Sequence, residues 1–135
     1  MNIGIDMLEK IVAFLLERVS PVLIVLFGSA AEGNFKSDSD LDIAFLTDCE
    51  ISGDEVYFLA QELAGFLSRD IDLIDLKHAS TVFKAQIVGK GEIIYAKDVL
   101  LRDEYRIRVL KEYALLNEER AEILDRIRRE GKIYE

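Results

Sequence analysis

One apolar run and the polar residues after it constrain this chain most. Residues 22–27 (VLIVLF) are apolar, mostly β-branched or aromatic, and bounded by Pro21 and Gly28. Such a run predicts a strand buried on both faces. Gly28 permits a sharp turn and a close approach of the backbone to a ligand. A short helix over residues 29–33 would direct free N–H groups at that turn, and the Ser29 hydroxyl adds a donor. The stretch therefore predicts a phosphate-binding turn.

A second strand, expected over residues 40–46, carries two carboxylates. Asp40 and Asp42 alternate with Leu41 and Ile43, so the two acids share one face. Two like charges about 4 Å apart repel by roughly 4 kcal/mol at an effective dielectric near 20, so a cation between them is expected. Mg²⁺ is commonly held by one or two carboxylates together with substrate phosphates. The alternative is a surface turn followed by an edge strand with two solvated aspartates.

Composition sets limits on domain number and partners. The 135 residues are 50% apolar, which predicts a single domain spanning residues 1–135. A net charge of −9 disfavours direct nucleic-acid binding. Cys49 is the single cysteine, which excludes an internal disulfide and favours a cytoplasmic setting. The apolar runs are too short for a signal peptide or a membrane span.

Periodicity predicts an α/β (α+β) fold of about four strands flanked by helices, with a long C-terminal helix; the family resemblance described below implies that these strands form a mixed central sheet. Beyond the two strands above, strands are expected over residues 70–76 and 92–96. The expected helices cover residues 3–19, 54–68, 80 or 81 to 88, and 98–130. The third is expected to end at Gly89 and Gly91, and the last to be one helix or two broken near Asn117.

The third strand offers further acids. Alternation places Asp70 and Asp72 on one face and Asp75 on the other. Asp72 lies inside the strand, as Asp42 does, and is the predicted third metal ligand. The alternative for Asp72 is that it is an exposed residue at a strand end with no role in metal binding. This alternative is stronger for Asp70 and Asp75. His78, in the following turn, is interpreted as a solvated loop residue, with approach to the site from a strand end as the alternative.

The C-terminal helix carries more apolar side chains than the edge of a four-stranded sheet requires. Whether its surplus face belongs to the core or to an interface is left open by the sequence. The apolar residues are Leu101, Tyr105, Val109, Leu110, Tyr113, Leu116, Ile123, Leu124 and Ile127.

The motif Gly28-Ser29, ten residues, then Asp40-Leu41-Asp42 resembles the signature of the nucleotidyltransferase superfamily that includes the β-type DNA polymerases. Residues 72–98 and the charged helix after them look like the MntA group, the antitoxin halves of MntA/HepT toxin–antitoxin pairs. This resemblance covers nearly the whole chain. It implies an adenylyltransferase that moves AMP from ATP to a tyrosine of a HepT (HEPN) ribonuclease toxin within a hetero-oligomer.

By position, the resemblance assigns nucleotide binding to Gly28, Ser29 and Ser39 and two Mg²⁺ ions to Asp40, Asp42 and Asp72. Asp72 would also help remove the proton of the attacking hydroxyl. Two residues depart from the family pattern: Glu32 stands where relatives often have a basic residue, and Thr81 stands where they often have proline. An acid near the triphosphate calls for compensation by Lys36 or by an arginine of the partner. Two other functions remain open: a transferase for small hydroxylated molecules, and an antitoxin that acts by binding alone.

Overall fold

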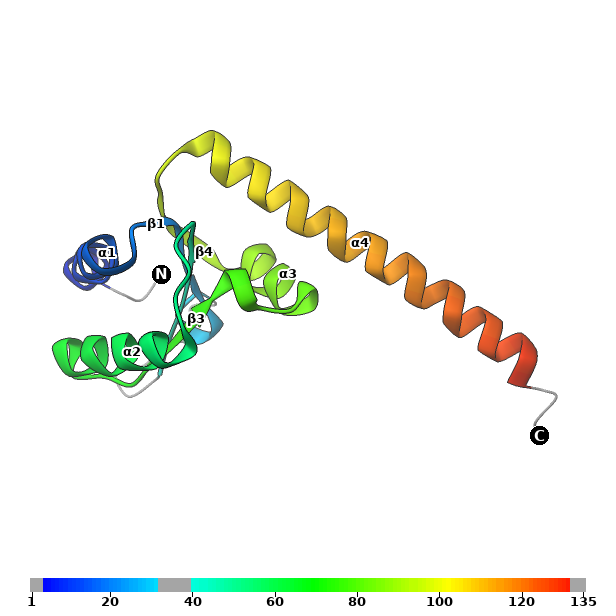
Figure 1. The fold of residues 1–135 in the computed structure, drawn as a ribbon, viewed down its shortest axis with the longest axis horizontal. Coiled ribbons are helices and arrows are strands. Elements are labelled where there is room, and N and C mark those ends of the chain that lie inside the picture. The colour runs from blue at the N-terminus through cyan, green and yellow to red at the C-terminus, as the bar shows by residue number, and fades with distance from the viewer. Residues whose placement is uncertain (1–3, 32–39, 132–135) are drawn as a thin grey trace.

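The computed structural model describes residues 4–31 and 40–131 (Figure 1). Four helices, four strands and two 3₁₀ turns follow one another along this part of the chain. In order they are α1 (Ile5–Val19), β1 (Pro21–Phe27), η1 (Gly28–Ala30), β2 (Leu41–Thr47), α2 (Gly53–Leu67), β3 (Ile71–Asp75), η2 (Leu76–His78), α3 (Thr81–Lys90), β4 (Glu92–Ala96) and α4 (Val99–Glu130).

The strands form one mixed sheet in the order β3-β2-β1-β4. β1 pairs antiparallel with both β2 and β4, whereas β2 and β3 are parallel because α2 carries the chain back between them. Figure 1 shows the sheet edge-on, with α1 and α2 on one side and α3 and α4 on the other. The fold is thus three layers, with the sheet in the middle.

Central strand β1 contributes to both cores, as its uninterrupted apolar sequence predicts. Ile24 and Leu26 are buried in the cluster that α1 and α2 cover. Leu23 and Val25 are buried in the opposite cluster, beneath α3 and α4. Because side chains alternate along a strand, one short apolar run ties the two helical layers together.

Short polar residues set the ends of the helices. Ser20 ends α1 in the left-handed region (φ 46°), and Pro21 then opens β1. The side chains of Ser52, Ser80 and Asp98 each accept a backbone N–H in the first turn of α2, α3 and α4. These caps fix where each helix leaves the sheet.

The predicted fold class is confirmed: the sheet is mixed and four-stranded, and a long helix follows it. Two details of the prediction are wrong. The turn after β1 begins at Gly28, one residue before the expected start, as the 3₁₀ turn Gly28–Ala30, and the expected range from residue 32 onward lies outside the described residues. Gly89 lies inside α3, since the Gly91 N–H donates to the Ile87 carbonyl and completes the last turn. Of the two alternatives for the C-terminal segment, one long helix is confirmed, because α4 passes Asn117 without a break.

Within the described part of the chain, no helix combines the length and apolar character that crossing a lipid bilayer requires.

Candidate active site

Two predicted site residues lie side by side at one end of the sheet. Asp42 of β2 is paired in register with Asp72 of β3 and, on its other side, with Phe27 of β1. The Leu41 N–H donates to the Asp70 carbonyl at 2.9 Å, which fixes the parallel register at the start of both strands. Neighbouring strands are about 4.8 Å apart, so the two carboxylates start from adjacent backbone positions. Residues separated by 30 positions are thereby brought together.

The row formed by Phe27, Asp42 and Asp72 lies on the α3 side of the sheet. Two residues further along β2 and β3, Ala44 and Ile74 belong to the core beneath α3 and α4. Alternation along the strands therefore places Asp42 and Asp72 on that same side. The sequence predicted that Asp42 and Asp72 serve one metal site, and the register shows that they share a face and which helical layer lies over it.

The environment of Asp42 disfavours its negative charge. Burial first, and then the charges of Asp72 and Asp40, raise the pKa of the Asp42 carboxyl above its ordinary value. Asp40 itself is exposed, immediately before β2. Three carboxylates thus interact electrostatically, and an added cation would stabilise the ionised form of Asp42.

Gly28 is required by the shape of the backbone. Its φ of +66° lies in the left-handed region, which costs other residues roughly 1–2 kcal/mol. A Cβ at this position would also overlap the Asp42 carboxylate, with Cγ of Asp42 only 3.1 Å away. Ser29 follows in η1, and buried Ala30 anchors the turn. The absent side chain of Gly28 is what lets the turn lie against Asp42.

The remaining predicted nucleotide-binding residue, Ser39, lies outside the described residues, as do Glu32 and Lys36. Their predicted roles stay predictions.

The described part of this site offers a divalent ion two neighbouring carboxylates and not a full set of protein ligands. Among residues 4–31 and 40–131, no three or more His, Cys, Asp and Glu side chains are gathered closely enough to hold an ion. Mg²⁺ often takes only one or two protein carboxylates and completes its shell with substrate phosphates and water. Asp42 and Asp72, with their mutual repulsion, fit that arrangement.

Beside Gly28, on the side of α3, is a hollow of about 250 Å³ that the sequence reasoning missed. Phe27 and Phe83 meet edge to face across it, with ring centroids 5.9 Å apart. Among the described residues that line it, Lys90 alone carries a charge. The complete lining is Phe27, Gly28, Phe83, Gln86, Ile87 and Lys90. The one sequence signal was a lysine between Gly89 and Gly91, directly before a strand.

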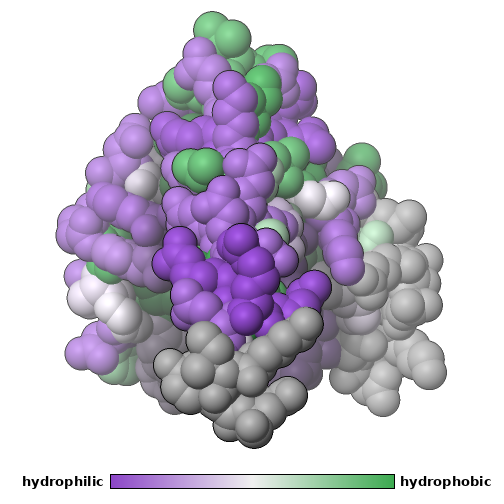
Figure 2. Space-filling view, turned by 90° about the vertical axis from the view of Figure 1, so that its right-hand side faces the viewer, coloured by the Kyte–Doolittle hydropathy of each residue, from purple (hydrophilic) through white to green (hydrophobic). Residues whose placement is uncertain are grey.

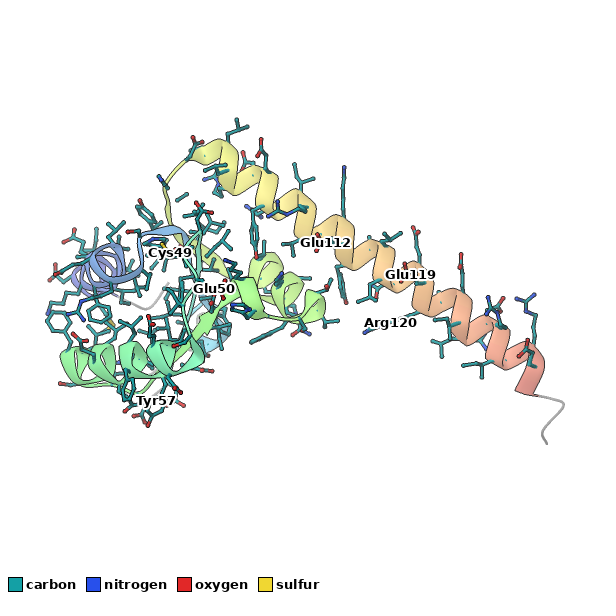
Figure 3. All side chains as sticks on the ribbon, in the orientation of Figure 1. Cys49, Glu50, Tyr57, Glu112, Glu119 and Arg120 are labelled. Atoms are coloured by element: carbon teal, nitrogen blue, oxygen red, sulfur yellow. The ribbon has the colours of Figure 1, made fainter. Side chains whose placement is uncertain are left out.

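Other candidates lie at the opposite end of the sheet. His78 follows the end of β3, whereas Asp72 lies at its beginning. The His78 Nε2 is 2.7 Å from a carboxylate oxygen of Glu50, which also pairs with Lys77. Figure 3 places Glu50 beside exposed Cys49, just after β2. These residues connect two loops and take no part in the carboxylate site.

Known proteins resemble the chain closely. The family model described as polymerase beta, nucleotidyltransferase, matches residues 9–100. Protein adenylyltransferase MntA of Shewanella oneidensis is 35% identical over 119 residues, which cover 87% of this chain and 84% of that protein.

Solved structures agree with the sequence matches. A toxin–antitoxin crystal structure with AMP-PNP has a TM-score of 0.81 and 33% identity, covering 89% of this chain and 97% of that one. A tri-AMPylated Shewanella oneidensis HEPN toxin in complex with MNT antitoxin matches with a TM-score of 0.76 and 31% identity, covering 90% and 96%. The chain therefore belongs to the polymerase beta nucleotidyltransferase family and, within it, to the MntA group.

Proposed function

We propose that this chain is a protein adenylyltransferase antitoxin, which transfers AMP from ATP to a tyrosine of a cognate HepT-type HEPN toxin and so neutralises it. The relative is named protein adenylyltransferase. The matching structures are an MntA–HepT complex, a toxin–antitoxin with AMP-PNP and a HEPN toxin carrying AMP. The observation on which the proposal depends most is the pairing of Asp42 with Asp72 beside Gly28.

The proposed roles follow the geometry. Gly28 and Ser29 offer the backbone and hydroxyl of a tight turn to the triphosphate. Asp42 and Asp72, assisted by Asp40, would hold two Mg²⁺ ions, and these would supply positive charge opposite the phosphates. Ser39 is proposed as a further nucleotide contact on the basis of its place in the motif.

In the reaction, the phenolic oxygen of the acceptor tyrosine forms a bond to the α-phosphorus of ATP. The bond from that phosphorus to the bridging oxygen breaks, and pyrophosphate leaves. The phenol has an ordinary pKa near 10, so its proton must be accepted locally at neutral pH. Asp72 is proposed to accept this proton, being on the strand at the open edge of the sheet. The chain otherwise contributes position and electrostatic stabilisation.

We also propose a cytoplasmic location, where the exposed thiol of Cys49 would stay reduced.

The direct test is to mix the purified chain with ATP, Mg²⁺ and the toxin encoded beside it, and to weigh the toxin by intact-mass spectrometry. We expect one or more AMP additions, located on tyrosine by fragmentation. Omission of Mg²⁺ should prevent them.

Three outcomes separate the possible functions. A stable complex with a toxin of unchanged mass would show an antitoxin that acts by binding alone. Pyrophosphate release with hydroxylated small molecules, but not with the toxin, would show a small-molecule transferase. Loss of AMP addition in Asp42→Asn, with complex formation retained, supports the proposed site.

A further inference from the structure

A pocket of about 610 Å³ lies at the end of the sheet opposite the carboxylate site. Its lining comes from the loop after β2, the first turns of α2, the end of β3 and the start of α3. Asp42 and Asp72 lie near the starts of β2 and β3, whereas this pocket lies toward the ends of the same two strands. It shares one residue, Phe83, with the hollow beside Gly28. Its volume is within the range of about 300–1,000 Å³ that is typical of small-molecule sites.

Asp75 brings an unsatisfied carboxylate oxygen to this pocket. Its side chain is only 8% exposed. One oxygen, Oδ1, accepts the backbone N–H of Lys77 at 3.1 Å. The other, Oδ2, is buried and has no hydrogen-bond partner among the described residues, and the buried hydroxyl of Tyr105 does not donate to it. A buried oxygen of this kind is costly unless a donor reaches it, so the pocket has an unfilled position for a hydrogen-bond donor.

The basic groups nearby are paired with Glu50 and not with Asp75. The Lys77 ammonium is 3.0 Å from a carboxylate oxygen of Glu50, and the His78 Nε2 is 2.7 Å from the other. Figure 3 shows Glu50 beside the ribbon of η2, between α2 and α3. The His78 Nε2 is 3.9 Å from Oδ2 of Asp75, which is too long for a hydrogen bond. Because the His78 side chain is 56% exposed, its ring can rotate and open the space between the two carboxylates.

The other walls of the pocket are largely apolar. Val56 of α2, Leu73 and Ile74 of β3 and Phe83 of α3 all line it. By contrast, the described surface seen from the free end of α4 in Figure 2 is mainly hydrophilic, and its hydrophobic residues form separate patches. Apolar walls with a few polar groups are typical of a ligand site. A ligand that fits this pocket therefore combines a hydrogen-bond donor with an apolar body.

The helix start in the lining does not favour an anion. Ser52, the N-cap of α2, lines the pocket, and an uncompensated helix start attracts negative charge. Here the Ser52 side chain already accepts the Glu55 N–H, and Asp54 and Glu55 place two acids in the first turn. Glu50 and Asp75 add two carboxylates to the same lining. The charges around the pocket thus favour a cationic donor.

We propose that this pocket binds a small molecule in which a primary ammonium group is attached to an apolar body. The ammonium donates to Oδ2 of Asp75 and lies toward Glu50, and the apolar body packs on Phe83 and Leu73. An ammonium suits the site better than a guanidinium, because Oδ1 of Asp75 already accepts the Lys77 N–H and leaves one oxygen instead of the two that a guanidinium pairs with. This inference does not depend on the proposed function.

The test uses His78 as its reporter, since it is the single histidine of the chain and its labelled ring gives one set of NMR signals. Phenethylamine is titrated into the full chain at constant pH, and we expect a saturable shift of the His78 ring signals. Phenethyl alcohol has the same apolar body without the charge, and ammonium chloride has the charge without the body. Each should bind at least about tenfold more weakly, as the loss of a charge-assisted hydrogen bond or of apolar burial implies.

Three variants locate the binding. Asp75→Asn keeps the size of the side chain and should raise the Kd for phenethylamine at least about tenfold. Asp70→Asn is its control, because Asp70 is an exposed acid just before the same strand and outside the lining, and it should change the Kd less than about twofold. Ala79→Phe fills the pocket without removing a charge and should abolish binding; the backbone there is extended and accepts any residue. Thermal unfolding shows that each variant is folded, and Ala79→Phe tests the pocket even if Asp75→Asn does not fold.

Several results would overturn the proposal. Equal affinities for phenethylamine and phenethyl alcohol would remove the ammonium assignment, and equal affinities for phenethylamine and ammonium chloride would remove the apolar body. Wild-type affinity in a folded Asp75→Asn or Ala79→Phe variant would place the ligand elsewhere. No saturable shift of the His78 signals with phenethylamine would show that the pocket is not a site for such amines.

Discussion

At the scale of single residues, the proposed function and the local environment have opposite effects on the charge of Asp42. The proposed reaction needs its negative charge to hold a cation, yet burial and the charges of Asp72 and Asp40 raise its pKa. An acid with a raised folded-state pKa favours the folded state below its unfolded pKa. That contribution is lost as pH rises through the folded pKa. At neutral pH, ionised Asp42 is therefore destabilising until a cation binds.

Asp42→Asn should consequently separate activity from stability. We expect AMP transfer to fall at least about 10³-fold, as when a group that stabilises the transition-state charge is lost. The melting temperature at pH 7 should rise, and the gain should shrink as the pH is lowered toward 3.8, the ordinary pKa of the group.

Scanning calorimetry with and without Mg²⁺ checks this prediction. The ion should raise the melting temperature of wild type but not that of the variant. A variant that melts lower than wild type at pH 7 would contradict the electrostatic interpretation.

For Lys90 we propose a role that the sequence did not indicate. It is the charged residue in the described lining of the hollow beside Gly28, and its positive charge would attract a polyanionic nucleotide bound near Asp42. Lys90→Ala should raise the KM for ATP about threefold to tenfold and change kcat little, since a contact made equally in ground and transition states affects binding alone.

Steady-state kinetics on Lys90→Ala, with Lys84→Ala as the control on the same helix, measure this effect. Lys84 is outside the hollow and should leave both constants unchanged. An equal rise in the KM for ATP in the two variants would mean that ATP binding depends on the total positive charge of α3 and not on a contact made by Lys90.

At the scale of helices and strands, α4 packs on the rest of the protein through buried side chains, and one of these, Tyr105, carries a polar group into an apolar environment. The Tyr105 hydroxyl is buried and has no hydrogen-bond partner among the described residues. Burial raises the pKa of Tyr105 to about 12, with Arg108 opposing and Glu112 and Asp75 adding to the rise. The ring supplies packing, whereas the hydroxyl carries a desolvation cost.

Tyr105→Phe should therefore be neutral or stabilising, by up to about 1 kcal/mol in urea unfolding. Wild type should also lose stability as pH rises from about 10 toward 12, since only its unfolded state ionises readily in that range. The phenylalanine variant should lack this loss. Tyr105→Ala is the comparison, because it removes the ring and should cost about 3–5 kcal/mol.

Sequence periodicity predicted the elements well because most of them have strong local signals. The strand over residues 92–96 was predicted with its observed bounds, and the helix expected from residue 80 or 81 begins at Thr81, after the Ser80 cap. Two features were beyond local reasoning. The turn at Gly28 is fixed by its contact with Asp42, and the extent of α3 by the fit of Gly91 against Leu26 and Val25 of β1. Both depend on partners far away in the sequence.

The candidate site was predictable in its residue types and not in its arrangement. Two acids in one strand and a third in another indicated a cation site, but the register that sets Asp72 beside Asp42 depends on the parallel pairing of β2 and β3. The hollow lined by Phe83 and Lys90 requires α3 to cross the end of β1. No spacing in the sequence specifies that crossing.

At the scale of the whole molecule, the charge is unevenly distributed. α4 has eight basic and eight acidic residues and is neutral, so the net charge of −9 belongs to the remainder, with nine basic and eighteen acidic residues. Self-repulsion of this kind opposes the compact state and weakens as salt screens it.

The melting temperature should therefore rise between about 0.05 M and about 0.5 M NaCl at pH 7, where the Debye length falls from roughly 14 Å to about 4 Å. Differential scanning fluorimetry measures this directly. Sucrose at matched osmolality is the control, since it stabilises by exclusion from the surface and not by screening. A flat response to salt would show that the acidic residues are already compensated.

The parallel pairing of β2 with β3 also has a consequence for the timing of activity during synthesis. Asp42 leaves the ribosome 30 residues before Asp72, and the two acids cannot meet until α2 has formed and returned the chain to the sheet. Because side chains alternate along a strand, a one-residue slip of β3 would turn Asp72 to the opposite layer, and the proposed reaction would then lack its third acid. Under the proposed function, AMP could be transferred to a newly made toxin only after the β2–α2–β3 crossover is complete, and this step would set the delay between translation and protection.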